Sequence, residues 1–171
     1  MPQTSVMQYV EALDKAGLLT RFKDEKRVDE LPRLMEDNPD TAVFVEKVKD
    51  CSFPFLANAY GARSMWALAL GCDFKKVGIE MAERSGLRQK PELVNTAPCK
   101  DVILKGNEVD LPIFPLFQHH QEDGQAFIND TNVVSRDPDT GLIDQGIYRC
   151  MYRSKNETNI DMPNDSHIGR I

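Results

Sequence analysis

The chain has 171 residues, a net charge of −6 at neutral pH, 41% hydrophobic residues and 28% charged residues. These values are ordinary for a soluble globular protein, and the length suffices for one domain or for a small domain plus part of a second. The acidic balance, without a basic stripe, argues against a nucleic-acid partner. No apolar run approaches the ~20 residues of a membrane span. The first twenty residues also lack a signal-peptide pattern, so we expect a cytoplasmic protein.

The first hundred residues alternate between helical and extended patterns. Ser5 is placed to cap a helix with Val6, Val10 and Leu13 on its core face, and Gly17 is placed to end that helix. A stretch of Lys, Pro and Asn without periodicity then favours a linker to a second unit. The order predicted after the first helix is a strand over 18–22, a helix over 28–35, strands over 42–45 and 53–57, helices over 64–70 and 74–84, and the linker over 87–98.

Short extended segments follow the linker in quick succession. Asp137–Gly141 contains the proline and glycine of a tight turn, whereas 111–116 is too rich in proline for a central strand. Closely spaced antiparallel strands with little helix suggest a barrel or a folded sheet. The strands predicted are 101–104, 126–128, 131–135, 144–152 and 158–162.

The last hairpin gathers the residues that are best suited to chemistry. It brings Asp144, Arg149 and His167 toward one region, so that an acid, a guanidinium and an imidazole can serve one ligand. Strict alternation along a strand places Asp144 and Arg149 on opposite faces, so a shared ligand requires a bulge or twist near Gly146. The alternative is a turn aspartate, an exposed arginine and a capping histidine that share no site.

The adjacent pair His119-His120 is a second candidate. Neighbouring side chains on an extended segment point to opposite sides, so two such histidines make a poor chelate by themselves. We expect these histidines at the surface or behind the residues that touch a ligand. Most of the acidic residues over 122–144 are expected in solvated turns.

The pattern Asp144-x-x-Ile147-x-Arg149, followed by a hairpin and by His167-Ile168, resembles the cofactor-binding segment of the UbiD family. Members of that family are prenylated-FMN-dependent (de)carboxylases of aromatic and α,β-unsaturated acids. The resemblance is collinear from about Ser5 to the end of the chain. It is also carried by Ala16-Gly17, Phe55–Asn58, Ala67–Gly71, Ala97–Cys99, Asp110–Pro112, Asp130-Thr131 and Asp137–Gly141.

The resemblance implies a role for each residue of the last hairpin. Asp144 and His167 correspond to ligands of a metal ion, Mn²⁺, which would bridge to the flavin phosphate, with K⁺ as an additional ion. Asp144 stands where Asn is most common, which adds a negative charge. Ile147, Tyr148 and Arg149 would line the flavin. Arg149 also matches the catalytic arginine of the family, whose planar cation suits a substrate carboxylate.

Ser166, preceded by Met162-Pro163, would border the cofactor phosphate by the same resemblance. The fold implied is α+β, with an N-terminal α/β domain over 1–98 and the first strands of a truncated, flavin-binding split β-barrel over 99–171. A glutamate ligand and the proton-transferring acids of the family correspond to positions beyond the last residue. We therefore expect the 171-residue chain alone not to turn over substrate.

The activity implied is that of a carboxy-lyase, a decarboxylase that reversibly removes CO₂ from a phenolic or other aromatic acid, or from an α,β-unsaturated acid. A flavin prenyltransferase would supply the cofactor. An unfinished barrel exposes a strand edge, so we expect a homo-oligomer or a partner chain that completes it. Two alternatives remain open, a non-catalytic scaffold or assembly subunit of a decarboxylase and a flavin-binding redox protein.

Overall fold

The computed structural model describes residues 5–87, 92–163, 166 and 168–170, and it shows a mixed α+β chain with two three-stranded sheets. Within these residues, no helix combines the length and the apolar character that crossing a bilayer requires. The helices and strands are α1 (Val6–Lys15), β1 (Leu19–Phe22), α2 (Leu31–Glu36), β2 (Ala42–Val45), β3 (Phe55–Ala57), α3 (Arg63–Leu70), α4 (Val77–Ser85), β4 (Phe127–Arg136), β5 (Ile143–Ser154) and β6 (Glu157–Asp161), with short 3-10 turns that include η1 (Val28–Glu30), η2 (Phe74–Lys76), η5 (Leu111–Ile113) and η6 (Ile168–Arg170).

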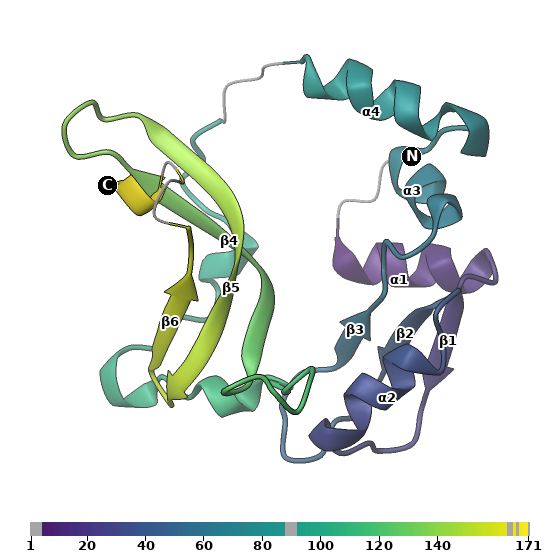
Figure 1. Ribbon diagram of the computed structural model, residues 1–171, viewed down its shortest axis with the longest axis horizontal. Coiled ribbons are helices and arrows are strands. Elements are labelled where there is room, and N and C mark those ends of the chain that lie inside the picture. Colours follow the sequence, from purple (N-terminus) through teal and green to yellow (C-terminus); the bar gives the residue numbers. More distant parts are fainter. Residues whose placement is uncertain (1–4, 88–91, 164–165, 167, 171) are drawn as a thin grey trace.

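The first sheet has the order β1-β2-β3, with β2 parallel to β1 and antiparallel to β3. All four residues of β2 are buried, because helices cover both faces of this sheet. On the right of Figure 1, α1, α2 and α3 gather around these strands. One face packs with α2 and the other with α1 and α3. The buried residues are Leu31, Val43, Val45, Val48, Phe55 and Phe117 on the first face, and Tyr9, Leu13, Ala42 and Met65 on the second.

Helix α1 follows the expected capping pattern. The Ser5 hydroxyl accepts a hydrogen bond from the backbone N–H of Gln8 at 3.2 Å, and Gly17 adopts a φ of +68° after the last turn. Val10 and Leu13 are fully buried as predicted. Val6 is 65% exposed, so its assignment to the core face was wrong, because Val6 borders an open surface pocket beside Leu56 and Tyr60.

The other predicted helices are present with small changes at their ends. The helix predicted over 28–35 begins as the 3-10 turn η1 and continues as α2, and the one predicted over 74–84 begins as η2 and continues as α4. Helix α3 ends at Gly71, whose φ of +66° is the left-handed conformation that glycine tolerates best. The terminators read from the sequence therefore lie at helix ends.

The second sheet has the order β4-β5-β6 and is antiparallel throughout. The predicted turn between β4 and β5 is confirmed, since the Asp137 carboxylate accepts the N–H groups of Asp139 and Thr140 at 2.8 and 3.1 Å, and Gly141 has a φ of +72°. The two strands predicted over 126–128 and 131–135 are in fact one strand, β4, interrupted by a bulge between Ile128 and Thr131.

The strand predicted over 101–104 was wrong. This segment has no regular structure, and Val102 and Ile103 are 75% and 58% exposed. Its apolar residues favour a strand, but a strand needs a neighbour for its backbone hydrogen bonds, and the described residues provide none there. The proline-rich segment forms the 3-10 turn η5 instead of a central strand, as expected.

Phe117 connects the two sheets. Its ring belongs to the buried core of the first sheet and meets the Phe55 ring edge-on at 5.4 Å between centroids. Its carbonyl oxygen accepts the N–H of Phe127 at the start of β4, at 3.2 Å. The beginning of the second sheet is therefore attached to the core of the first one.

Candidate cofactor and substrate site

Strand β5 carries most of the predicted site residues, and their burial alternates along it. Asp144, Gly146 and Tyr148 are half-buried on one face, whereas Ile147 and Arg149 are exposed on the other. The pairing of β5 with β4 is unbroken from residue 143 to 148. The bulge hypothesised near Gly146 is therefore absent, and Asp144 and Arg149 lie on opposite faces of the sheet.

One edge of β5 is nevertheless open beside both residues. Strand β6 pairs with β5 only from Arg149 to Ser154, so residues 143–148 have no strand partner on that side among the described residues. An open strand edge presents its N–H and C=O groups to a ligand. Side chains from both faces can reach around such an edge, so Asp144 and Arg149 can both serve a long ligand that lies along it.

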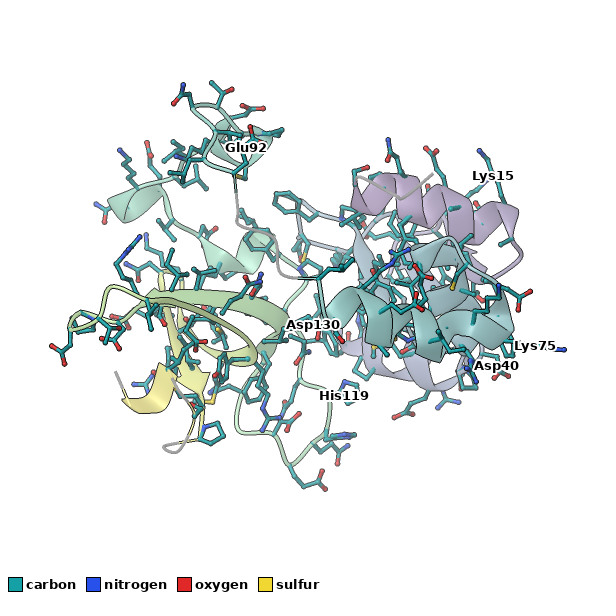
Figure 2. All side chains as sticks on the ribbon, turned by 90° about the horizontal axis from the view of Figure 1, so that it is seen from above. Lys15, Asp40, Lys75, Glu92, His119 and Asp130 are labelled. Carbon is teal, nitrogen blue, oxygen red and sulfur yellow. The ribbon has the colours of Figure 1, made fainter. Side chains whose placement is uncertain are left out.

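The irregularity in the pairing of β4 with β5 is a bulge on β4, directly opposite Arg149. Asn129 and Asp130 together face this single residue, and Asp130 has a φ of +56°, which is uncommon for a residue with a side chain. The Thr131 hydroxyl donates to the carbonyl of Ile128 at 3.2 Å across the bulge. Figure 2 shows Asp130 in the region between the two sheets. The extra residue thus turns an acidic side chain away from the regular ladder.

Arg149 lies over the ring of Phe127, with 4.7 Å between the guanidinium carbon and the ring centroid. This cation–π contact holds the charged group beside an aromatic surface. Phe127 in turn lines a cavity of about 550 Å³ between the two sheets. The volume and the aromatic walls suit a small aromatic ligand. The lining residues that matter most are Phe55, Asn58, Phe114, Phe117, His119, Phe127 and Asp130.

His119 is half-buried in the wall of this cavity, whereas His120 is exposed. The His119 ring lies 5.8 Å from the Phe117 ring and 4.6 Å from the His120 ring, between centroids. The two histidines differ in exposure, as alternation along an extended segment predicts. The aromatic residues immediately before His119 are the signal that could have placed it against an apolar cavity.

The other face of β5 gathers oxygen atoms. Ser135 on β4 is the direct cross-strand partner of Asp144, and both side chains are half-buried on the same face. The Ser135 hydroxyl oxygen is buried and has no hydrogen-bond partner among the described residues. The sequence held a signal for this pair, since counting outward from the Asp137–Gly141 turn matches position 135 with position 144.

Gly146 makes room for the ring of Tyr148 on this face. A Cβ atom at Gly146 would lie 2.5 Å from Cε2 and 3.0 Å from the hydroxyl oxygen of Tyr148. The ring therefore lies flat along β5 and leans from residue 148 toward Asp144. Glycine is needed here for close approach of a side chain, and not for a bulge as hypothesised.

The residues around Asp144 fit a hard divalent cation. Carboxylate oxygens are preferred ligands of Mg²⁺ and Mn²⁺, and a serine hydroxyl can add a neutral oxygen ligand to such an ion. The buried Ser135 hydroxyl is a polar atom that a ligand would satisfy. In the part of the chain that the structure describes, no three His, Cys, Asp or Glu side chains gather closely enough to hold an ion. Asp144 and Ser135 by themselves therefore fall short of a complete coordination shell among the described residues.

The remaining predicted residues lie beyond β6. The Ser166 hydroxyl donates to the carbonyl of Pro163 at 2.7 Å and accepts the N–H of Gly169 at 3.0 Å. It therefore holds the chain turn that leads into η6. The predicted metal and flavin ligand His167 lies outside the described residues.

Comparison with known proteins agrees with the resemblance found in the sequence. Residues 10–85 match the 3-octaprenyl-4-hydroxybenzoate carboxy-lyase N-terminal domain, and residues 92–170 match the Rift-related domain of the same enzymes. Together these matches span nearly all of the chain. The chain belongs to the UbiD family.

Individual relatives are longer than this chain. The phenolic acid decarboxylase of Sedimentibacter hydroxybenzoicus is 27% identical over 172 residues, which cover 90% of this chain and 35% of the relative. An evolved dimeric form of the UbiD-class enzyme HmfF from Pelotomaculum thermopropionicum, in complex with prFMN, superposes with a TM-score of 0.89 at 23% identity, covering 98% of this chain and 40% of that enzyme. The closed form of the Sedimentibacter hydroxybenzoicus vanillic acid decarboxylase superposes with a TM-score of 0.88 at 22% identity, covering 99% of this chain and 39% of that enzyme. The chain thus spans somewhat over a third of the relatives it matches.

Proposed function

We propose that this chain forms the N-terminal part of a decarboxylase that reversibly removes CO₂ from a phenolic or other aromatic acid, with α,β-unsaturated acids as the second substrate class. The observation that carries the proposal is that the Arg149 guanidinium lies on the ring of Phe127, a residue that also lines an aromatic cavity of about 550 Å³. A fixed cation next to an apolar pocket suits a molecule with an aromatic ring and a carboxylate. The family membership and the phenolic acid decarboxylase relative support the same reaction.

The chain's own residues would bind and orient the acid. The guanidinium of Arg149 pairs with the substrate carboxylate through two parallel hydrogen bonds, which fixes the bond to be broken. Phe127 and the other cavity rings contact the aromatic part and exclude water from it. Prenylated FMN, when bound, supplies the electron sink that loss of CO₂ from such an acid requires. Ile147 and Tyr148, with Arg149, would contact this flavin.

The metal ion would be bound near Asp144, at a distance from the substrate that Arg149 would bind. Asp144 and His167 would hold Mn²⁺, accompanied by K⁺, beside the cofactor phosphate and near Ser166. Arg149 lies five residues from Asp144 along β5, which corresponds to about 16 Å in an extended strand. The open edge of β5 between them is where an elongated cofactor would lie.

The proposal includes partners and a domain organisation. A domain over 1–98 would be followed by the first strands of a split β-barrel over 99–171. A flavin prenyltransferase would supply the cofactor in the cytoplasm. A second copy or another chain would complete the barrel at an exposed strand edge, and the dimeric form of HmfF is an example of a relative that self-associates. The 171-residue chain alone would bind the cofactor and not turn over substrate.

The test is native mass spectrometry of the chain after co-expression with a flavin prenyltransferase and purification without air. We expect one prenylated FMN and one divalent ion per chain. Arg149→Ala is expected to keep the cofactor and lose binding of 4-hydroxybenzoate, measured by calorimetry. Arg153→Ala is the matched control, since Arg153 is an exposed arginine of the same strand.

Other results would favour the alternatives. Tightly bound unmodified FMN with reductase activity would favour a flavin redox protein. A chain that binds no flavin, and whose Arg149→Ala variant still supports a separate decarboxylase, would favour a scaffold subunit.

A further inference from the structure

Ser135 stands out among the hydroxyl groups of the second sheet. Its oxygen is shielded from solvent and has no hydrogen-bond partner among the described residues. Buried polar groups in folded proteins are nearly always hydrogen-bonded, so an exception indicates a missing partner such as a ligand or an ordered water. Thr131 lies four residues earlier on the same face of β4, and its hydroxyl is satisfied by the carbonyl of Ile128 at 3.2 Å. The strand can therefore satisfy such a group, and at Ser135 it does not.

The position of Ser135 connects it with the proposed metal site near Asp144. It is the direct cross-strand partner of Asp144, and such partners have Cβ atoms about 5 Å apart on one face. That separation lets two short side chains direct their oxygens at one ion. The pair lies next to the rigid Asp137–Gly141 turn, which fixes its register. The Tyr148 ring covers the strand on the next position of the same face.

We propose that the Ser135 hydroxyl is an oxygen ligand of the divalent cation held by Asp144, a role that rests on the proposed function. Hard divalent cations take neutral hydroxyl oxygens together with carboxylates. Ser135 adds a ligand without adding charge. A neutral ligand is favourable beside the cofactor phosphate, because Asp144 already brings a negative charge to the ion.

The experiment is a titration of the full chain with Mn²⁺, followed by the electron paramagnetic resonance signal of the free ion. Ser135→Ala is expected to weaken Mn²⁺ binding by about 10-fold or more, in the range found for residues that support a metal site. Ser135→Thr keeps the hydroxyl and should bind like the wild type. Ser135→Cys keeps the size and exchanges a hard oxygen for a soft sulfur, so it should lose Mn²⁺ affinity and gain Cd²⁺ affinity. Ser154→Ala, at the far end of β5, is the control.

Thermal unfolding of the same variants without metal provides a second readout. An unpaired buried hydroxyl destabilises the chain until a ligand satisfies it, so Ser135→Ala should unfold at the same or a higher temperature than the wild type. A serine that only stabilises the fold would give a lower temperature.

The outcomes separate the two proposals. Loss of Mn²⁺ binding in Asp144→Ala with unchanged binding in Ser135→Ala would overturn the role of Ser135 and leave the proposed function standing. A wild-type chain that binds no Mn²⁺, with or without flavin, would overturn both the Ser135 ligand and the metal part of the proposed function.

Discussion

The two sheets of this chain differ in how completely their strands are covered. All four residues of β2 in the first sheet are buried, whereas only Cys150 is buried among the twelve residues of β5 in the second. Val134, Ile143 and Ile147 of the second sheet are 61%, 58% and 75% exposed. Burial of apolar surface supplies most folding free energy, so the first sheet should dominate the stability of this chain. The second sheet keeps side chains and a strand edge available for a ligand or another chain.

The largest expected effect comes from removing core volume in the first sheet. Leu31 is fully buried between α2 and β2, so Leu31→Ala should lower the free energy of unfolding by about 2–5 kcal/mol. Ile147→Ala removes a side chain of the same size from the second sheet, where it is 75% exposed, and should change the free energy of unfolding little. Urea denaturation measures both. Similar losses in the two variants would contradict the comparison between the sheets.

The variant Gly146→Ala tests whether the second sheet tolerates an added side chain as well as its exposure suggests. A methyl group there would lie 2.5 Å from the Tyr148 ring, so Gly146→Ala must displace that ring. We expect a loss of about 1–3 kcal/mol, typical of an inserted group in a packed contact. Denaturation, together with nuclear magnetic resonance shifts of the tyrosine ring, measures the effect. Gly124→Ala is the control, because a Cβ atom at Gly124 meets no neighbour within 4 Å. Unchanged Tyr148 resonances in Gly146→Ala would show that the ring does not depend on the glycine.

Tyr9 gives the first sheet a pH dependence. Its hydroxyl donates to the carbonyls of Ala59 and Met65 at 2.8 and 3.1 Å. Burial, and secondly the charge of Tyr60, raise the pKa of Tyr9 from 10.0 to about 12. The unfolded chain loses this proton at a lower pH than the folded chain. The contribution of Tyr9 to the free energy of unfolding is therefore complete below pH 10 and falls as the pH rises toward 12.

The variant Tyr9→Phe should cost about 1–2 kcal/mol at neutral pH, because two buried carbonyl groups lose their donor. It should also flatten the decline above pH 10. Unfolding free energies measured between pH 8 and 12 compare the two chains. An equally steep alkaline decline in Tyr9→Phe would assign the pH dependence to other groups.

The smallest expected effect concerns the surface of the first sheet. Arg21 of β1 pairs with Asp14 of α1 at 2.8 Å and with Glu46 at 3.1 Å, and the hydrogen bonds that Arg21 donates to the Asp14 carboxylate are the main cause that raises the pKa of Arg21. Asp14→Asn should cost under about 1 kcal/mol, and less at high salt, because the pair is partly exposed. Asp37→Asn is the control, since Asp37 pairs with Arg33 at 3.4 Å on a more exposed part of α2. A loss that does not respond to salt would contradict an ionic origin.

Local rules in the sequence predicted the elements that depend on few residues. The cap at Ser5, the terminators at Gly17 and Gly71 and the Asp137–Gly141 turn are all set by side chains and backbone preferences within a few positions. Such predictions succeed because no distant partner is needed.

Predictions that depended on distant partners failed or stayed open. The apolar segment over 101–104 has a strand-like composition and no neighbouring strand among the described residues. The bulge hypothesised at Gly146 lies instead on β4 at Asn129–Asp130, because register is decided by the pair of strands and not by either one. The roles of Asp144, His167 and Ser166 toward a metal and a phosphate stay predictions.

The sequence by itself determined the α+β class, the family and the residues of β5 that are candidates for chemistry, because these depend on local patterns and collinear motifs. Only the tertiary structure decided that Phe127 lies under Arg149 and that His119 lines a cavity between the two sheets. Each of these contacts joins residues from different segments. Their positions depend on strand register and on the packing of Phe117 into the first core, which no single stretch of sequence specifies.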